Sequence, residues 1–290
     1  MMNRRQMITN MAGAAAITAA GIPINKAMEK DKPNSGRLKG NIHHSVSQWC
    51  YGDIPLDSFA QACAAMGLES IELLQEKDWP VVQKYGLKCA VGYATDYGIP
   101  KGFNKEENHA KLIADYEAII PRAAAAGVPN LICFSGNREG QNDNEGLIVC
   151  AKGLRKLMPL AGKHGVTLIM ELLNSYGHKD YQCDKTEWGA ALCEMVGSDR
   201  FKLLYDIYHM QIMEGNIIDT IRKYNRYIGH YHTGGVPGRN EIDETQELNY
   251  PAIMKAVVAT GYKGYVGQEF VPTGSDKLAS LKKCIAICDV

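Results

Sequence analysis

The chain has no excess of either charge. Its 290 residues carry 32 acidic and 32 basic side chains, and its sequence pI is about 7.1. Proteins that bind nucleic acids or anionic membranes need a basic surface, so this balance argues against both kinds of partner. The composition leaves a small neutral or acidic molecule as the expected partner.

The chain also lacks an apolar run long enough to span a bilayer. Arg4 and Arg5 precede a mild apolar stretch at 11–22, which is too short to cross about 30 Å of hydrocarbon. We interpret residues 1–27 as a twin-arginine-type signal peptide and 28–40 as a polar spacer, with an ordinary N-terminal tail as the alternative. This interpretation predicts export to the periplasm and no stable membrane insertion after cleavage of the leader.

The cysteines form no CxxC pair. Nine are scattered along the chain, an odd number, and several lie inside apolar runs such as LICF (131–134). Free cysteine behaves as a small hydrophobic residue. We therefore expect buried thiols and no thiolate metal site.

Glycine is regularly spaced between helix-like and strand-like segments, at positions 67, 86, 127, 165, 197 and 261. Glycine ends helices in a left-handed conformation that other residues adopt at a cost. Helices and strands that alternate in this way are typical of a parallel sheet covered by helices. We expect strands at 44–49, 69–74, 88–93, 130–135, 166–171, 202–206, 227–233 and 264–270, and helices at 56–66, 77–85, 106–126, 143–164, 185–196, 214–224, 249–260 and 275–288.

Eight strands in about 250 residues predict an α/β fold of the (β/α)8 TIM barrel class at 41–290. The main competitor is a doubly wound sheet. No GxGxxG or P-loop motif follows the first expected strand, which removes the usual nucleotide-binding reason for that alternative.

Four polar residues end the last four expected strands: Glu171, Asp206, His232 and Glu269. In a barrel these positions face one shared mouth. Three carboxylates gathered there repel one another, and a divalent cation is the simplest compensation. The donor set suits Mn, Mg, Co or Zn. The alternative is that these acids are separate helix caps or surface residues.

Neighbouring residues supply weaker candidates for substrate binding. His230 lies on the same side of its strand as His232, and we expect it in the core or behind the metal ligand. His209 lies on the expected loop after Asp206, and Arg239 on the loop after the seventh strand, where it suits a carboxylate or hydroxyl. Asn174 and His178 lie on the loop after the fifth strand.

Four segments resemble the hydroxypyruvate isomerase branch of the xylose-isomerase-like TIM barrels: ELLNSYGHKDYQCD (171–184), LLYDIYHMQ (203–211), GHYHTGGVPGRNEID (229–243) and YVGQEF (265–270). The resemblance implies one divalent metal held by Glu171, Asp206, His232 and Glu269. It also implies that Glu171 and Glu269 are the catalytic acid–base pair and that His209 and Arg239 bind substrate. His232 departs from the glutamine of the bacterial hydroxypyruvate isomerases and is closer to the ketose epimerases.

The resemblance implies a metal-dependent isomerase or epimerase of sugars or hydroxy-keto acids that acts through an enediolate, and a homo-oligomer remains open. Three alternatives stay open as well: a lyase or dehydratase acting on keto-sugars, a phosphodiesterase of the endonuclease type, and a non-catalytic sugar-binding barrel. The neutral charge and the eight histidines count against the phosphodiesterase. The intact ligand set counts against the non-catalytic barrel.

Overall fold

The computed structural model describes residues 38–290. The expected leader and residues 28–37 of the expected spacer lie outside the described residues. The last spacer residues contact the barrel: Leu38 packs against the core, and the backbone N–H of Lys39 donates to the Asp289 carboxylate at 3.0 Å.

Eight parallel strands form one sheet with the spatial order β2-β1-β8-β7-β6-β5-β4-β3. The strands are β1 (His43–Ser47), β2 (Ser70–Glu72), β3 (Val91–Gly92), β4 (Asn130–Cys133), β5 (Thr167–Glu171), β6 (Phe201–Asp206), β7 (Ile228–Thr233) and β8 (Tyr265–Gln268). Two isolated parallel bridges, Ser70 to Lys88 and Leu74 to Gly92, join β2 to β3. The sheet is therefore a nearly closed barrel, and the predicted fold class is confirmed.

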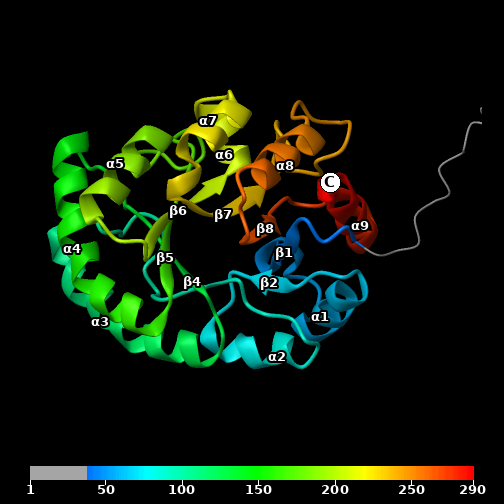
Figure 1. Ribbon diagram of the computed structural model, residues 1–290, viewed down its shortest axis with the longest axis horizontal. Coiled ribbons are helices and arrows are strands. Elements are labelled where there is room, and N and C mark those ends of the chain that lie inside the picture. Colours follow the sequence, from blue (N-terminus) through cyan, green and yellow to red (C-terminus); the bar gives the residue numbers. More distant parts are fainter. Residues whose placement is uncertain (1–37) are drawn as a thin grey trace, which may run out of the picture. The chain divides into compact units, whose positions relative to one another are not determined.

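Helices surround the strands in Figure 1. Within residues 38–290 they are α1 (Leu56–Ala65), α2 (Trp79–Gln83), α3 (Glu106–Ala125), α4 (Asp143–His164), α5 (Thr186–Val196), α6 (Ile207–Met213), α7 (Ile217–Tyr224), α8 (Tyr250–Ala259) and α9 (Lys277–Cys288). The expected loop after Asp206 is wrong, because α6 begins directly after that residue. The Asp206 side chain accepts from the Tyr208 backbone N–H at 2.8 Å and caps this helix.

The six glycines behave as predicted. Each has a φ angle between +69° and +86°, in the left-handed region: positions 67, 86, 127, 165, 197 and 261. Gly165 shows the arrangement clearly, since it follows α4 and its N–H bonds back to the last turn. The chain then enters β5 without a long connection, which brings Glu171 to the barrel mouth.

The barrel interior is divided into an apolar and a polar half. Alternate residues of a strand face opposite sides, so Ile169 lies on the same side as Glu171, and Leu204 on the same side as Asp206. These residues belong to a small buried cluster, separate from the main core, made of Leu73, Ala90, Val91, Ile132, Ile169 and Leu204. On the other half, β7 and β2 place His230, His232 and Glu72 in the interior, all fully buried.

All nine cysteines are buried free thiols, as predicted. Burial raises the pKa of the Cys50 thiol and of the Cys63 thiol well above the ordinary value. The protonated thiols therefore pack as apolar groups. Among residues 38–290, no helix has both the length and the apolar character that a membrane-spanning segment requires.

Candidate metal centre

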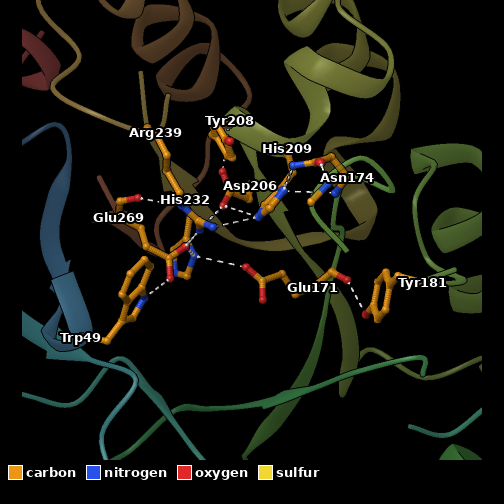
Figure 2. Close-up of polar contacts among 12 residues, drawn as sticks. Trp49, Glu171, Asn174, Tyr181, Asp206, Tyr208, His209, His232, Arg239 and Glu269 are labelled. Atoms are coloured by element: carbon orange, nitrogen blue, oxygen red, sulfur yellow. Dashed lines mark hydrogen bonds and ion pairs between the residues drawn. The ribbon is translucent and has the colours of Figure 1, made fainter. Parts of the chain in front are cut away.

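The structure brings the four strand-end residues together. Glu171 and Asp206 are the last residues of β5 and β6, His232 lies in β7, and Glu269 follows β8 directly. One donor atom from each residue lies within 4.8 Å of the other three. All four side chains are buried, with Glu171 the most exposed at 6 %. Figure 2 shows them turned toward a common point from four neighbouring strands.

His232 uses its two ring nitrogens in opposite directions. Its Nδ1 lies 2.7 Å from Glu269 Oε2 and 3.7 Å from Glu171 Oε1, while its Nε2 lies 2.5 Å from Glu72 Oε1. Burial lowers the pKa of His232, but the surrounding carboxylates outweigh burial and raise it well above the ordinary value. In this arrangement His232 therefore carries a positive charge among the carboxylates.

Arg239 supplies the second positive charge. Its Nη2 donates to Asp206 Oδ2 at 2.9 Å and to Glu269 Oε2 at 2.5 Å. The guanidinium lies 5.3 Å from the Trp49 ring centroid and 5.1 Å from that of Tyr208. Cations over aromatic faces are attracted by the ring quadrupole. Arg239 is therefore fixed above the cluster, as Figure 2 shows.

Glu269 is held at both carboxylate oxygens. The Trp49 indole Nε1–H donates to its Oε1 at 2.6 Å, and its Oε2 contacts Arg239 and His232. Burial alone raises the pKa of Glu269, but His232, Arg239 and the indole lower it well below its ordinary value. Glu269 is therefore the firmly ionised member of the cluster.

The other two carboxylates are less compensated. Burial raises the pKa of Asp206 to about 7, although Arg239 opposes the shift. Burial and the charge of Glu269 also raise the pKa of Glu171, although the nearby His232 opposes the shift. The Glu171 backbone carbonyl accepts from Tyr181 Oη at 2.9 Å, which fixes the chain at this strand end. The Glu171 carboxylate has no contact as short as those of Glu269 within residues 38–290.

His209 lies at the edge of the cluster, on α6 rather than on the expected loop. Its Nε2 is 3.1 Å from Arg239 Nη1 and 3.5 Å from Asp206 Oδ2. The Asn174 backbone N–H donates to its Nδ1 at 3.1 Å. Burial and the charge of Arg239 lower the pKa of His209 well below its ordinary value, so the ring is neutral.

Asn174 and His178 both contact His209, which in turn lies beside the cluster. The Asn174 side chain lies 2.6 Å from His209 Nδ1, and its Oδ1 accepts from the Gly177 backbone N–H at 2.7 Å. The His178 ring meets the His209 ring edge to face, with centroids 5.4 Å apart. The structure therefore joins both residues of this loop to α6.

The cluster fits a divalent metal ion. Three carboxylates and one imidazole are hard oxygen and nitrogen donors of the kind that Mn, Mg, Co and Zn accept, and their donor atoms already converge. Buried carboxylates need compensation, which Arg239 and protonated His232 provide in part here. The residues that would hold the ion are Glu171, Asp206, His232 and Glu269.

Three neighbours of the cluster were not predicted from the sequence: Trp49, Glu72 and Tyr208. Glu72 is the last residue of β2, but the expected strand ran to residue 74, so the rule that identified the other four did not select it. Trp49 lies in a one-turn 3-10 helix at Gln48–Tyr51, within the range expected to be strand. No local pattern marks its hydrogen bond to a residue 220 positions away.

Comparisons with known proteins find relatives of this sequence. A 2-oxo-tetronate isomerase of Cupriavidus necator is 36 % identical over 112 residues, which cover 39 % of this chain and 43 % of that protein. The chain thus spans less than half the length of this relative. The hydroxypyruvate isomerase of Escherichia coli is 27 % identical over 222 residues, which cover 76 % of this chain and 80 % of that enzyme.

A solved structure shows the same fold. The crystal structure of a family 2 AP endonuclease from Brucella melitensis superposes with a TM-score of 0.73 at 22 % identity, covering 83 % of this chain and 97 % of that one. The family described as xylose isomerase-like TIM barrel matches residues 60–284, and this range contains all four cluster residues. On this match and on the barrel itself, the chain belongs to the xylose isomerase-like TIM barrel family.

Proposed function

We propose that this chain is a divalent-metal-dependent isomerase or epimerase of an α-hydroxy carbonyl compound, either a sugar or a hydroxy-keto acid. The observation that carries the proposal is the convergence of Glu171, Asp206, His232 and Glu269 within 4.8 Å at the barrel mouth. The relatives named hydroxypyruvate isomerase and 2-oxo-tetronate isomerase support this substrate class.

A bound divalent ion would supply Lewis acidity, which makes the C–H bond next to a carbonyl easier to ionise. The two glutamates of the cluster would then transfer the proton. Glu171 accepts the proton, because its carboxylate is not tied by the short contacts that hold Glu269. Glu171 would then return this proton to the neighbouring or the opposite position of the enediolate, or Glu269, which lies across the cluster, would return a proton that it has first taken from a substrate hydroxyl. Transfer by a positioned carboxylate contributes about 10²–10⁴-fold in rate.

Arg239 and His209 orient the substrate. Both lie beside Asp206 at the mouth, and the guanidinium carries donors suited to hydroxyl or carboxylate oxygens. The neutral His209 ring, positioned by Asn174, offers a hydrogen bond without adding charge. Positioning of this kind supplies a large share of the acceleration in many enzymes.

Proton–deuterium exchange tests the proposal most directly. The protein is incubated in D₂O with Mn²⁺ or Mg²⁺ and a panel of α-hydroxy carbonyl compounds, including hydroxypyruvate and several ketoses, and exchange is followed by NMR. We expect metal-dependent exchange of one C–H bond in at least one compound. Glu171→Gln should reduce the exchange rate by about 10²-fold or more while metal remains bound.

The controls separate this chemistry from its alternatives. Mass spectrometry of the same mixtures detects loss of one water, which would indicate a dehydratase instead. If Glu171→Gln and Glu269→Gln both keep near wild-type turnover with metal bound, the acid–base assignment is wrong.

A further inference from the structure

A fourth acidic residue of the barrel interior, Glu72, lies behind the cluster. It ends β2 and is completely buried. Its Oε1 accepts from His230 Nε2 at 2.9 Å and from His232 Nε2 at 2.5 Å. Both histidines are on β7, and their rings meet edge to face with centroids 5.0 Å apart. One carboxylate oxygen therefore holds two imidazoles of the same strand.

The strand opposite Glu72 has a glycine at the point of closest approach, and no larger residue fits there. Gly267 on β8 pairs with His232 in the sheet, and a Cβ added there would lie 2.3 Å from Glu72 Oε1 and 2.9 Å from His232 Cδ2. Real Cβ contacts do not become that short, so a larger residue would displace the carboxylate or the ring. The carboxylate is thus closely packed between two strands.

The hydrogen bond from His232 decides which ring nitrogen faces the cluster. A neutral imidazole has one N–H donor and one acceptor nitrogen. Because Nε2–H donates to Glu72, Nδ1 is the nitrogen that faces Glu171 and Glu269, and a divalent ion would displace the proton that Nδ1 carries in the metal-free cluster. Histidines that ligate metals commonly donate their other N–H to a carboxylate, which fixes the tautomer and the ring orientation.

We infer that Glu72 is a positioning residue for the proposed metal centre: it holds His232 so that Nδ1 is presented to a divalent ion. This inference rests on the proposed metal-dependent function. A separate ion between Glu72, His230 and His232 is a poorer account, because a single oxygen already lies at hydrogen-bond distance from both ring nitrogens. The role is indirect, since Glu72 touches His232 and not the cluster carboxylates.

Metal affinity tests the inference without reference to activity. The metal-stripped full chain is titrated with Mn²⁺, and free Mn²⁺ is measured by electron paramagnetic resonance. Removal of a carboxylate that orients a ligating histidine typically costs 10–100-fold in metal affinity. We expect Glu72→Gln, which keeps the shape but not the charge, to weaken Mn²⁺ binding at least tenfold, and Glu72→Asp to weaken it by retracting the carboxylate. Circular dichroism and thermal unfolding show whether each variant folds.

His230→Gln is the matched control, because it keeps a donor for Glu72 and supplies none of the four cluster side chains, although its ring meets that of His232 edge to face. It should bind Mn²⁺ within about threefold of wild type. Equal losses in His230→Gln and Glu72→Gln would assign the effect to packing and overturn the inference. Wild-type affinity in folded Glu72→Gln would overturn it as well.

Histidine NMR gives a second, independent measurement. In the wild-type chain loaded with Zn²⁺ and labelled with ¹⁵N-histidine, we expect His232 to be protonated on Nε2 and coordinated through Nδ1. Protonation on Nδ1 would refute the inference while leaving metal binding intact. If the wild-type chain binds neither Mn²⁺ nor Zn²⁺, the proposed function itself fails, and the two failures are thereby distinguished.

Discussion

The substitution Arg239→Met distinguishes the charge of Arg239 from its packing as the source of stability at the candidate metal centre. The side chain is 17 % exposed and its Nη2 contacts the carboxylates of Asp206 and Glu269, which are 0 % and 4 % exposed. Removing one partner of a buried ion pair costs about 3–5 kcal/mol, because the remaining charge is left uncompensated. Methionine keeps much of the aliphatic volume between Trp49 and Tyr208 and removes the charge.

Because Arg239 is partly exposed, we expect the free energy of unfolding to fall by an amount near the lower limit of this range, about 3 kcal/mol. For a domain of this size that corresponds to a fall in Tm of about 6–12 °C. A divalent ion replaces the missing charge, so saturating Mn²⁺ should raise the Tm of the variant more than that of wild type. At 100-fold excess over Kd the wild-type gain is about 2.7 kcal/mol.

The assay is differential scanning calorimetry of both proteins with EDTA and with Mn²⁺. Arg138→Met is the control, because Arg138 pairs with the buried Asp184 at 3.0 Å and contacts none of the four cluster side chains. It should lose stability without a larger response to Mn²⁺ than wild type. If Arg239→Met loses the same stability with and without Mn²⁺, the guanidinium acts through packing and our electrostatic account is refuted.

Three further predictions follow from the same geometry. Metal ligation requires an ionised Asp206, whose pKa is raised to about 7, and a neutral His232, whose pKa is also raised, so Mn²⁺ affinity measured by calorimetry should rise at least tenfold per pH unit below pH 7 and continue to rise above it; a constant affinity from pH 5.5 to 8 would contradict this. Trp49→Phe removes a 2.6 Å hydrogen bond to Glu269, of a kind worth about 1.5–3 kcal/mol, and should lower kcat about tenfold or more and Tm by about 3–12 °C; an unchanged kcat would exclude a role for the indole N–H. Gly267→Ala should reduce stability in urea unfolding by about 1–3 kcal/mol, because its Cβ overlaps Glu72; equal stability would show that the interior yields.

The fold could be predicted because its signals are local. Six glycines with positive φ angles end helices, and continuous apolar runs such as those in β4 and β5 are typical of strands buried on both faces. The predicted ends of the strands are less accurate where the backbone is irregular. Leu73 adopts a φ of +56° and ends β2 early, and β3 is reduced to two residues next to a seam of isolated bridges.

The candidate site could be predicted in part for the same reason. The carboxyl ends of parallel strands meet at one face, so position along each strand was enough to group Glu171, Asp206, His232 and Glu269. The hydrogen bonds that organise the group are not local. Glu72 and Trp49 lie 160 and 220 residues from their partners, and no periodicity reports such a contact.

The contact between Glu72 and His232 also has a consequence for the order of events during folding. Its two residues are separated by 160 positions, from the second strand to the seventh. Contacts of high sequence separation form late, because a long segment of chain must first be closed into a loop. A partly synthesised or half-folded barrel therefore contains acidic strand ends but no oriented histidine among them. The proposed metal site is therefore complete only when the first and last quarters of the barrel have joined.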